Sequence, residues 1–211
     1  MKHRKTLTTA ILASLLFSGI AIAADSVGEP GRSSKGPNPL KNVYFGEEHM
    51  HTTNSPDAFV VGTRGTWEDA YKWAMGEEII LSTTKEKIKK STPLDFVAIT
   101  DHAEYFGVMP SLIDSNSPLY NTELGKLMRD PDAKPSDPGS AINQILGSLI
   151  SGNPMKEFVT PELARSNWNR YMDTANKYNK PGEFTTMVAW EWTSIPNGRN
   201  MHRNVFFRDK F

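Results

Sequence analysis

The sequence predicts an α/β fold, in which β-strands alternate with helices along the chain. Three observations lead to this prediction. Short β-prone runs recur, segments with apolar residues at helical spacing separate them, and loops rich in Gly and Pro join the two. The 211 residues, 38% hydrophobic and 23% charged, have the composition of an ordinary globular protein, and the absence of cysteine excludes disulfides, zinc-thiolate sites and cysteine nucleophiles.

The first 23 residues have the layout of a secretory signal peptide. A basic start from Lys2 to Lys5 leads into an apolar run from Ala10 to Ala21, and Ala21-Ile22-Ala23 is a small-residue cleavage pattern. The alternative is an uncleaved membrane anchor, but the run is short for a bilayer span and contains Ser and Gly. We therefore expect cleavage after Ala23, a periplasmic or secreted protein, and no membrane span in the mature chain.

Residues 24–40 are rich in Gly, Pro and Ser, and we expect them to form a flexible linker before a single domain over residues 41–211. Removing residues 1–23 takes away three of the 24 Lys and Arg residues and none of the 24 acidic ones, which leaves a net charge of −3. A slightly acidic protein has no electrostatic reason to bind nucleic acid or anionic lipid.

The first half of the predicted domain reads as strand, helix, strand. Val43-Tyr44-Phe45 is a β-prone run that stops at Gly46, and the buried pattern from Leu94 to Ile99 predicts a second strand. Between them, apolar side chains at helical spacing predict a helix over residues 66–76, whose start resembles a capping box. Such units usually have parallel strands.

The second half adds three helices and two strands. Thr160-Pro161-Glu162 is a strong helix start, and a loop with three prolines separates the two helices before it. Because four strands are too few for a closed (β/α)8 barrel, the pattern predicts an open sheet or part of a barrel. The predicted elements are helices over 119–128, 141–150 and 160–178, and strands over 184–190 and 204–207.

Four histidines lie within a few residues of predicted strand ends: His49, His51, His102 and His202. Ligands of parallel α/β folds gather at the carboxyl ends of strands, and two histidines separated by one residue in an extended segment point the same way. Glu191 adds a carboxylate after the third strand, and this mixture suits zinc, manganese or iron. A single histidine is more simply a satisfied polar residue, but the whole set favours a metal centre.

Four segments resemble, in order, the first motifs of the PHP (polymerase and histidinol phosphatase) superfamily of metal-dependent phosphoesterases: His49-Met50-His51-Thr52, Ile99-Thr100-Asp101-His102, the strand end at Glu191, and His202. A narrower likeness covers residues 42–208 and is to a bacterial family of secreted PHP-like proteins long labelled as being of unknown function. It rests on Tyr44-Phe45-Gly46-Glu47-Glu48-His49-Met50-His51-Thr52, Trp190-Glu191-Trp192-Thr193-Ser194 and Asn200-Met201-His202-Arg203-Asn204-Val205.

This resemblance implies a distorted (β/α)7 barrel with two or three divalent metal ions, Mn, Zn or Fe, at its carboxyl face. It implies that His49 and His51 bind the first metal, and that Glu191 bridges the first and second. His202 would bind the second metal, and Asp57 with His102 would hold the third.

Two further carboxylates, Asp101 and Glu104, would orient the imidazoles from behind. An ordinary turn or capping role is the alternative for Asp57 and Asp101. The later motifs of the superfamily, a further His and a closing Asp-x-His, do not follow His202 within these 211 residues. We therefore expect the chain to be the amino-terminal part of such a protein, with the C-terminal barrel strands missing and with little activity of its own.

The expected function is that of a metal-dependent hydrolase of phosphoester or phosphonate ester bonds in a small-molecule substrate, acting through metal-activated water. Glu191 and Arg203 are the candidate catalytic residues, with Arg203 as a phosphate clamp beside a proposed ligand. Two alternatives remain. One is a non-catalytic, exported metal- or ligand-binding protein, and the other is a metal-dependent hydrolase acting on carbon centres.

Overall fold

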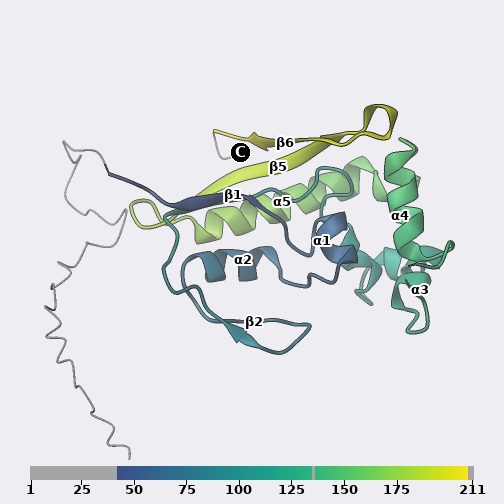
Figure 1. The fold of residues 1–211 in the computed structure, drawn as a ribbon, viewed down its shortest axis with the longest axis horizontal. Coiled ribbons are helices and arrows are strands. Elements are labelled where there is room, and N and C mark those ends of the chain that lie inside the picture. The colour runs from purple at the N-terminus through teal and green to yellow at the C-terminus, as the bar shows by residue number, and fades with distance from the viewer. Residues whose placement is uncertain (1–41, 135, 209–211) are drawn as a thin grey trace, which may run out of the picture.

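The structure is a computed structural model that describes residues 42–134 and 136–208 (Figure 1). The predicted signal peptide, residues 1–23, and the predicted linker, residues 24–40, lie outside the described residues. Among the described residues, none of the helices combines the length and the apolar character that a bilayer span requires.

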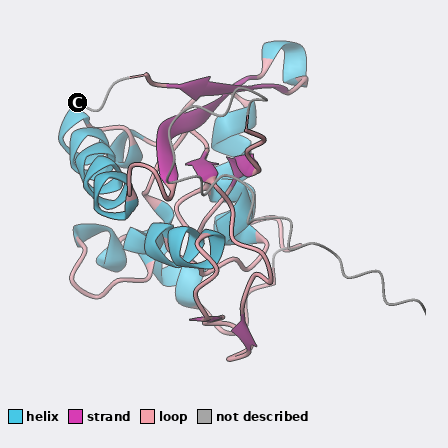
Figure 2. Cartoon of the chain, turned by 90° about the vertical axis from the view of Figure 1, so that its left-hand side faces the viewer, coloured by secondary structure: helices cyan, strands magenta, loops and turns pink. Residues whose placement is uncertain are grey.

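A curled, half-barrel sheet of four strands organises the described part of the chain (Figure 2). The strands lie in the order β1 (Gly46–Met50), β4 (Phe96–Ile99), β5 (Thr185–Ser194) and β6 (Met201–Phe206). β1, β4 and β5 are parallel, whereas β6 pairs antiparallel with β5 as a hairpin. The mixed α/β class and the parallel pairing of the first two predicted strands are therefore confirmed.

The first strand, β1, begins at Gly46, the residue at which the predicted strand over 43–45 stopped. Residues 43–45 precede β1, and Phe45 is tied to Asp95 by two hydrogen bonds: its N–H donates to the Asp95 carboxylate and its carbonyl accepts from the Asp95 N–H, both at 2.7 Å. Gly46, the first residue of β1, pairs with Phe96, whose ring occupies the place that a side chain would take at Gly46. The shift places His49 inside β1 and His51 directly after it.

Three of the predicted helices are present with nearly the predicted bounds. α2 (Trp67–Ala74) begins with a capping box in which Thr66 accepts from the Asp69 N–H, and the Asp69 carboxylate accepts from the Thr66 N–H. α4 covers Ala141–Ile150, and α5 covers Pro161–Tyr178 after the Thr160 cap. The predicted helices at 66–76, 141–150 and 160–178 are therefore confirmed.

The remaining elements differ from the prediction. β5 continues four residues past the predicted strand over 184–190, and β6 begins three residues before the predicted strand over 204–207. The predicted helix over 119–128 is divided, because Thr122 caps a new helix, α3 (Glu123–Arg129), after a 3₁₀ turn over Pro118–Asn121. Helix α1 (Pro56–Val60) and the small hairpin of β2 (Ile79–Ile80) and β3 (Lys87–Ile88) were not predicted. Two-residue strands and a five-residue helix carry too little periodicity to be recognised in a sequence.

One face of the sheet is covered by α5, which packs against β5, and by α2, which packs against β4 and against α5 (Figure 1). The core between them contains Val97, Ile99 and Val188 from the sheet, and stacked aromatic rings from the helices. Tyr171 of α5 pins two strands, because its hydroxyl donates to the Ile99 carbonyl at 2.8 Å and accepts from the Ala189 N–H at 3.1 Å. Side chains alternate along a strand, so Glu191 belongs to the other face.

Candidate metal centre

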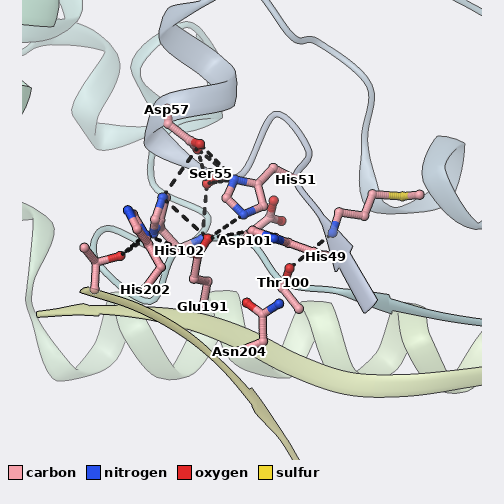
Figure 3. Close-up of polar contacts among 12 residues, drawn as sticks. His49, His51, Ser55, Asp57, Thr100, Asp101, His102, Glu191, His202 and Asn204 are labelled. Carbon is pink, nitrogen blue, oxygen red and sulfur yellow. Dashed lines mark hydrogen bonds and ion pairs between the residues drawn. The ribbon is translucent and has the colours of Figure 1, made fainter. Parts of the chain in front are cut away.

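The six side chains predicted as metal ligands lie together at the carboxyl ends of the parallel strands (Figure 3). They arise from β1 and the turn after it, from helix α1, from the segment after β4, and from the β5–β6 hairpin. Their ligand atoms form three overlapping groups, each with atoms within 4.8 Å of one another: His49, His51 and Glu191; His51, Asp57 and His102; His102, Glu191 and His202.

The carboxylate of Glu191 lies close to all four histidines of the centre. Its buried carboxylate places Oε2 at 3.2 Å from His49 Nε2 and 2.7 Å from His51 Nε2. The same oxygen is 3.7 Å from His102 Nε2, while Oε1 is 2.8 Å from His202 Nδ1. The two oxygens thus face different histidines, as expected of a carboxylate that contacts two cations.

His51 Nε2 shows that hydrogen bonding alone does not account for this geometry. The atom is buried and lies 2.7 Å from Glu191 Oε2, yet it has no hydrogen-bond partner. Buried polar atoms are normally hydrogen-bonded, so a nitrogen and a carboxylate oxygen this close without a hydrogen bond between them are a suitable pair of ligands for a cation. A divalent cation between them would satisfy both atoms, and the imidazole and carboxylate donors suit such a cation.

Asp57 lies against the other nitrogen of His51. Its carboxylate oxygens are 2.9 and 3.0 Å from His51 Nδ1, and 3.7 Å separates Oδ2 from His102 Nε2. Burial raises the pKa of Asp57, but the hydrogen bonds from His51 and Ser55 outweigh it and hold that pKa well below its usual range. For His51, burial acts to lower the pKa, but Asp57 raises it above the ordinary value.

This pairing defines what Asp57 can do. A proton on His51 Nδ1 is held by the Asp57 carboxylate, which leaves the Nε2 lone pair free on the side of Glu191. Asp57 therefore orients His51 directly, in addition to belonging to a possible ligand group with His102. Ser55 completes the arrangement, because its hydroxyl donates to Asp57 and accepts from the His102 N–H at 3.1 Å.

Asp101 does not orient an imidazole as predicted. Its fully buried carboxylate accepts from the Thr52 hydroxyl and from Trp67 Nε1, both at 2.7 Å, and from the Thr52 N–H. Burial raises the pKa of Asp101 to about 6 despite these three donors. The carboxylate is directed at the turn after His51 because Thr52 and Trp67 surround it, so it fixes the backbone that carries the ligand.

Glu104 and Thr193 support His102 and His202. Glu104 Oε2 lies 3.7 Å from His102 Nδ1, and Oε1 accepts from the Thr193 N–H at 3.1 Å. Burial raises the pKa of Glu104 and lowers that of His102. The Thr193 hydroxyl is 2.8 Å from His102 Nδ1 and 3.1 Å from His202 Nδ1. Thr193 was not predicted, although its position two residues after Glu191 places it on the same face of β5.

Arg203 does not belong to the centre. In the β5–β6 register, Thr193 lies opposite His202, and Trp192 lies opposite Arg203. Neighbours along a strand point to opposite faces, so Arg203 leaves the sheet on the side away from the imidazoles, where its guanidinium lies 5.7 Å from the Trp192 ring centre. This placement gives no support to the predicted phosphate clamp at Arg203, which stays a prediction.

Fold and site together define a mixed α/β protein whose strand ends carry side-chain groups that could hold divalent cations. The chain belongs to the family described as "Protein of unknown function (DUF3604)", whose model matches residues 38–211. It is also similar to a linear gramicidin synthase protein of Brevibacillus parabrevis, with 28% identity over 80 residues. That match covers 37% of this chain and 1% of the synthase, so the chain spans a very small part of that relative. No solved structure matches the chain.

Proposed function

We propose that this protein is a metal-dependent hydrolase that cleaves phosphoester or phosphonate ester bonds in small molecules. The main support is Glu191, a buried carboxylate whose two oxygens face separate histidines. The order of the motifs supports the same class, since it resembles the PHP superfamily. On this proposal the curled sheet is part of a distorted (β/α)7 barrel, and the protein acts outside the cytoplasm after loss of residues 1–23.

The ligand groups favour a centre of two cations. The group of His49, His51 and Glu191 and the group of His102, Glu191 and His202 have only Glu191 in common. Glu191 can serve both groups because its Oε2 faces His49 and His51 while its Oε1 faces His202. The third group takes His51 and His102 from the other two, and a neutral imidazole has a single lone pair to give. A third cation therefore competes with the first two for these histidines.

The reaction is the displacement of an alcohol by water. The water oxygen forms a bond to phosphorus, the ester P–O bond breaks, and the departing oxygen takes up a proton as the alcohol leaves. Bound divalent cations supply an acidified water and a countercharge for the developing negative charge. The residues of the chain hold the geometry: Asp57 fixes the tautomer of His51, and Thr193 positions His102 and His202 against each other.

A non-catalytic metal-binding protein is the second candidate. It is favoured by the side chains beside the centre, because the described residues that line the adjoining pocket include neither Lys nor Arg to clamp an anionic substrate. A metal-dependent hydrolase acting on carbon centres is the remaining alternative. It would differ from the phosphoester hydrolase and from the binding protein by cleaving amides or lactones.

The test is an assay of the protein loaded with Mn²⁺, Zn²⁺ or Fe²⁺ on bis(4-nitrophenyl) phosphate and 4-nitrophenyl phenylphosphonate, with an aryl amide and a lactone in parallel. We expect only slow turnover of the phosphorus esters, which disappears in His51→Ala and persists in the matched control Arg203→Gln. Stoichiometric metal binding without hydrolysis of any substrate would select the binding protein, and turnover of the amide or lactone alone would select the carbon hydrolase.

A further inference from the structure

A pocket of about 590 Å³ opens directly beside the metal centre. One wall consists of groups from the centre, including Asp57, His102 and His202. Another part of the lining is apolar and comes from helix α4, together with Ile195 from the turn between β5 and β6. A molecule held by the cations at one end would therefore meet hydrocarbon at the other.

The apolar wall is a distinct face of α4. Leu149 and Ile150 lie three and four residues after Leu146, so the three side chains project on one side of the helix. Ala141 and Ile145 are buried in the core that α4 shares with α1 and α3, and Leu149 also packs against the edge of that core. Ile150 lines the pocket beside the polar groups of the centre, and it is 60% exposed. Apolar surface exposed beside convergent polar groups is typical of a small-molecule site.

The charges of the lining residues narrow the ligand further. The pocket contains two carboxylates, Asp57 and Glu104, and its described lining includes neither Lys nor Arg. Glu104 Oε2 is buried and has no hydrogen-bond partner, so it adds negative potential next to His102. Any countercharge for an anion comes from the cations, which reach the reacting group and not the far wall. A second anionic group at the α4 end would meet no cationic side chain among these lining residues.

We propose that this pocket is the substituent subsite of the enzyme, and that the substrate is an ester with one negative charge at phosphorus and an uncharged aliphatic or aromatic substituent. The substituent lies against Leu146, Leu149 and Ile150. This inference rests on the proposed function for the identity of the reacting group. It adds the class of substrate, which excludes nucleotides and sugar bisphosphates with further anionic groups at this position.

Phosphinates test the subsite without any reaction, because they carry one negative charge and contain only P–C bonds to carbon. Calorimetry on the Mn²⁺-loaded protein would compare dimethylphosphinate with methyl(phenyl)phosphinate. We expect the phenyl compound to bind about 10-fold more tightly, since a methyl group is replaced by a ring that buries apolar area. A carboxylate added to the para position of the ring should remove that gain.

The double variant Leu146→Ser/Ile150→Ser changes the apolar wall and leaves Leu149, which packs on the core, in place. We expect the affinity ratio of the two phosphinates to fall to about 1 in this variant. Val159→Ser is the matched control, because Val159 is also exposed but does not line the pocket, and it should keep the wild-type ratio. Melting temperatures in the absence of ligand would verify that both variants fold.

The proposal is overturned if the wild type binds the two phosphinates equally or binds neither, or if the double variant retains the wild-type ratio. Failure of the proposed function looks different. In that case the ratio depends on Leu146 and Ile150 as expected, while no phosphorus ester is hydrolysed, and the pocket is the ligand site of a binding protein.

Discussion

The inner histidines of the centre, His51 and His102, have side chains that are 15% and 12% exposed, whereas those of the outer histidines, His49 and His202, are 56% and 43% exposed. All four approach the same carboxylate, that of Glu191. The inner and outer halves of one centre thus differ in how firmly the fold holds them.

The inner half is held by groups that contact it from behind. Asp57 bonds the far nitrogen of His51, and Ser55 bonds the backbone of His102. Asp101 fixes the turn after His51 through Thr52. The outer histidines stand on β1 and β6, the two edge strands of the sheet. We infer from this difference that the inner half is organised without a cation, and we expect that a bound cation would order the outer half further.

We expect metal binding to produce the largest change in the free energy of unfolding, because a bound cation would join the outer histidines to the inner ones. At a free Mn²⁺ or Zn²⁺ concentration of about 100 times the dissociation constant, binding to the native state raises the free energy of unfolding by about 2.7 kcal/mol. For a domain of this size we expect the melting temperature to rise by roughly 5 to 11 °C. Differential scanning calorimetry with metal and with excess chelator measures this shift. Identical melting temperatures under both conditions would contradict it.

Replacing one inner and one outer histidine compares the two halves directly. We expect His51→Ala to weaken metal binding by about 100-fold and His202→Ala by about 10-fold, the range seen when supporting contacts of metal ligands are lost. His51→Ala costs more because it also leaves the Asp57 carboxylate without its imidazole partner. Isothermal titration calorimetry of both variants gives the two affinities. Equal losses, or a larger loss in His202→Ala, would remove the distinction between the halves.

Asp101→Asn tests whether the support behind the inner half stabilises the fold. The buried carboxylate accepts three hydrogen bonds, and an amide offers a single acceptor oxygen, so a donor of Thr52 or Trp67 loses its partner. We expect a loss of about 1 to 3 kcal/mol in the free energy of unfolding, measured by urea denaturation. Asp114→Asn, at an exposed loop position, is the control and should change it by less than about 0.5 kcal/mol. Asp101→Asn with wild-type stability would show that the contacts contribute nothing.

Arg203→Gln should have the smallest effect. The side chain lies on the face of the hairpin away from the imidazoles, although its neighbour His202 belongs to the centre. We expect metal affinity to stay within about twofold of wild type and the free energy of unfolding within about 0.5 kcal/mol. A 10-fold loss of metal affinity in the titration would place the guanidinium in the centre after all.

Elements with local signals could be predicted from the sequence. The Thr66 capping box and the Thr160-Pro161 start are physical features of a few adjacent residues, and both helices appear where these signals place them. The first strand could not be placed so well. Residues 43–45 are β-prone, but the pairing partner decides where a strand forms, and the pairing with β4 begins at Gly46, opposite Phe96.

The same distinction applies to the centre. Histidines at strand ends share one edge of a parallel sheet, so the gathering of His51 and His102 follows from topology that the sequence reveals. The directions of the neighbouring side chains that support these histidines depend on strand register and on packing. Asp101 is directed at Thr52, Arg203 points to the opposite face, and Thr193 bridges two imidazoles, and no motif in the sequence distinguishes these outcomes.

The central claim is that Glu191 joins the inner and outer histidines around divalent cations. Native mass spectrometry of the protein after exchange into Mn²⁺ or Zn²⁺ counts the ions bound to each chain, and the isosteric variant Glu191→Gln provides the comparison. We predict two ions per wild-type chain and at most one, weakly held, in Glu191→Gln. A wild-type chain that carries no ion, or a variant that carries as many as the wild type, would contradict the account.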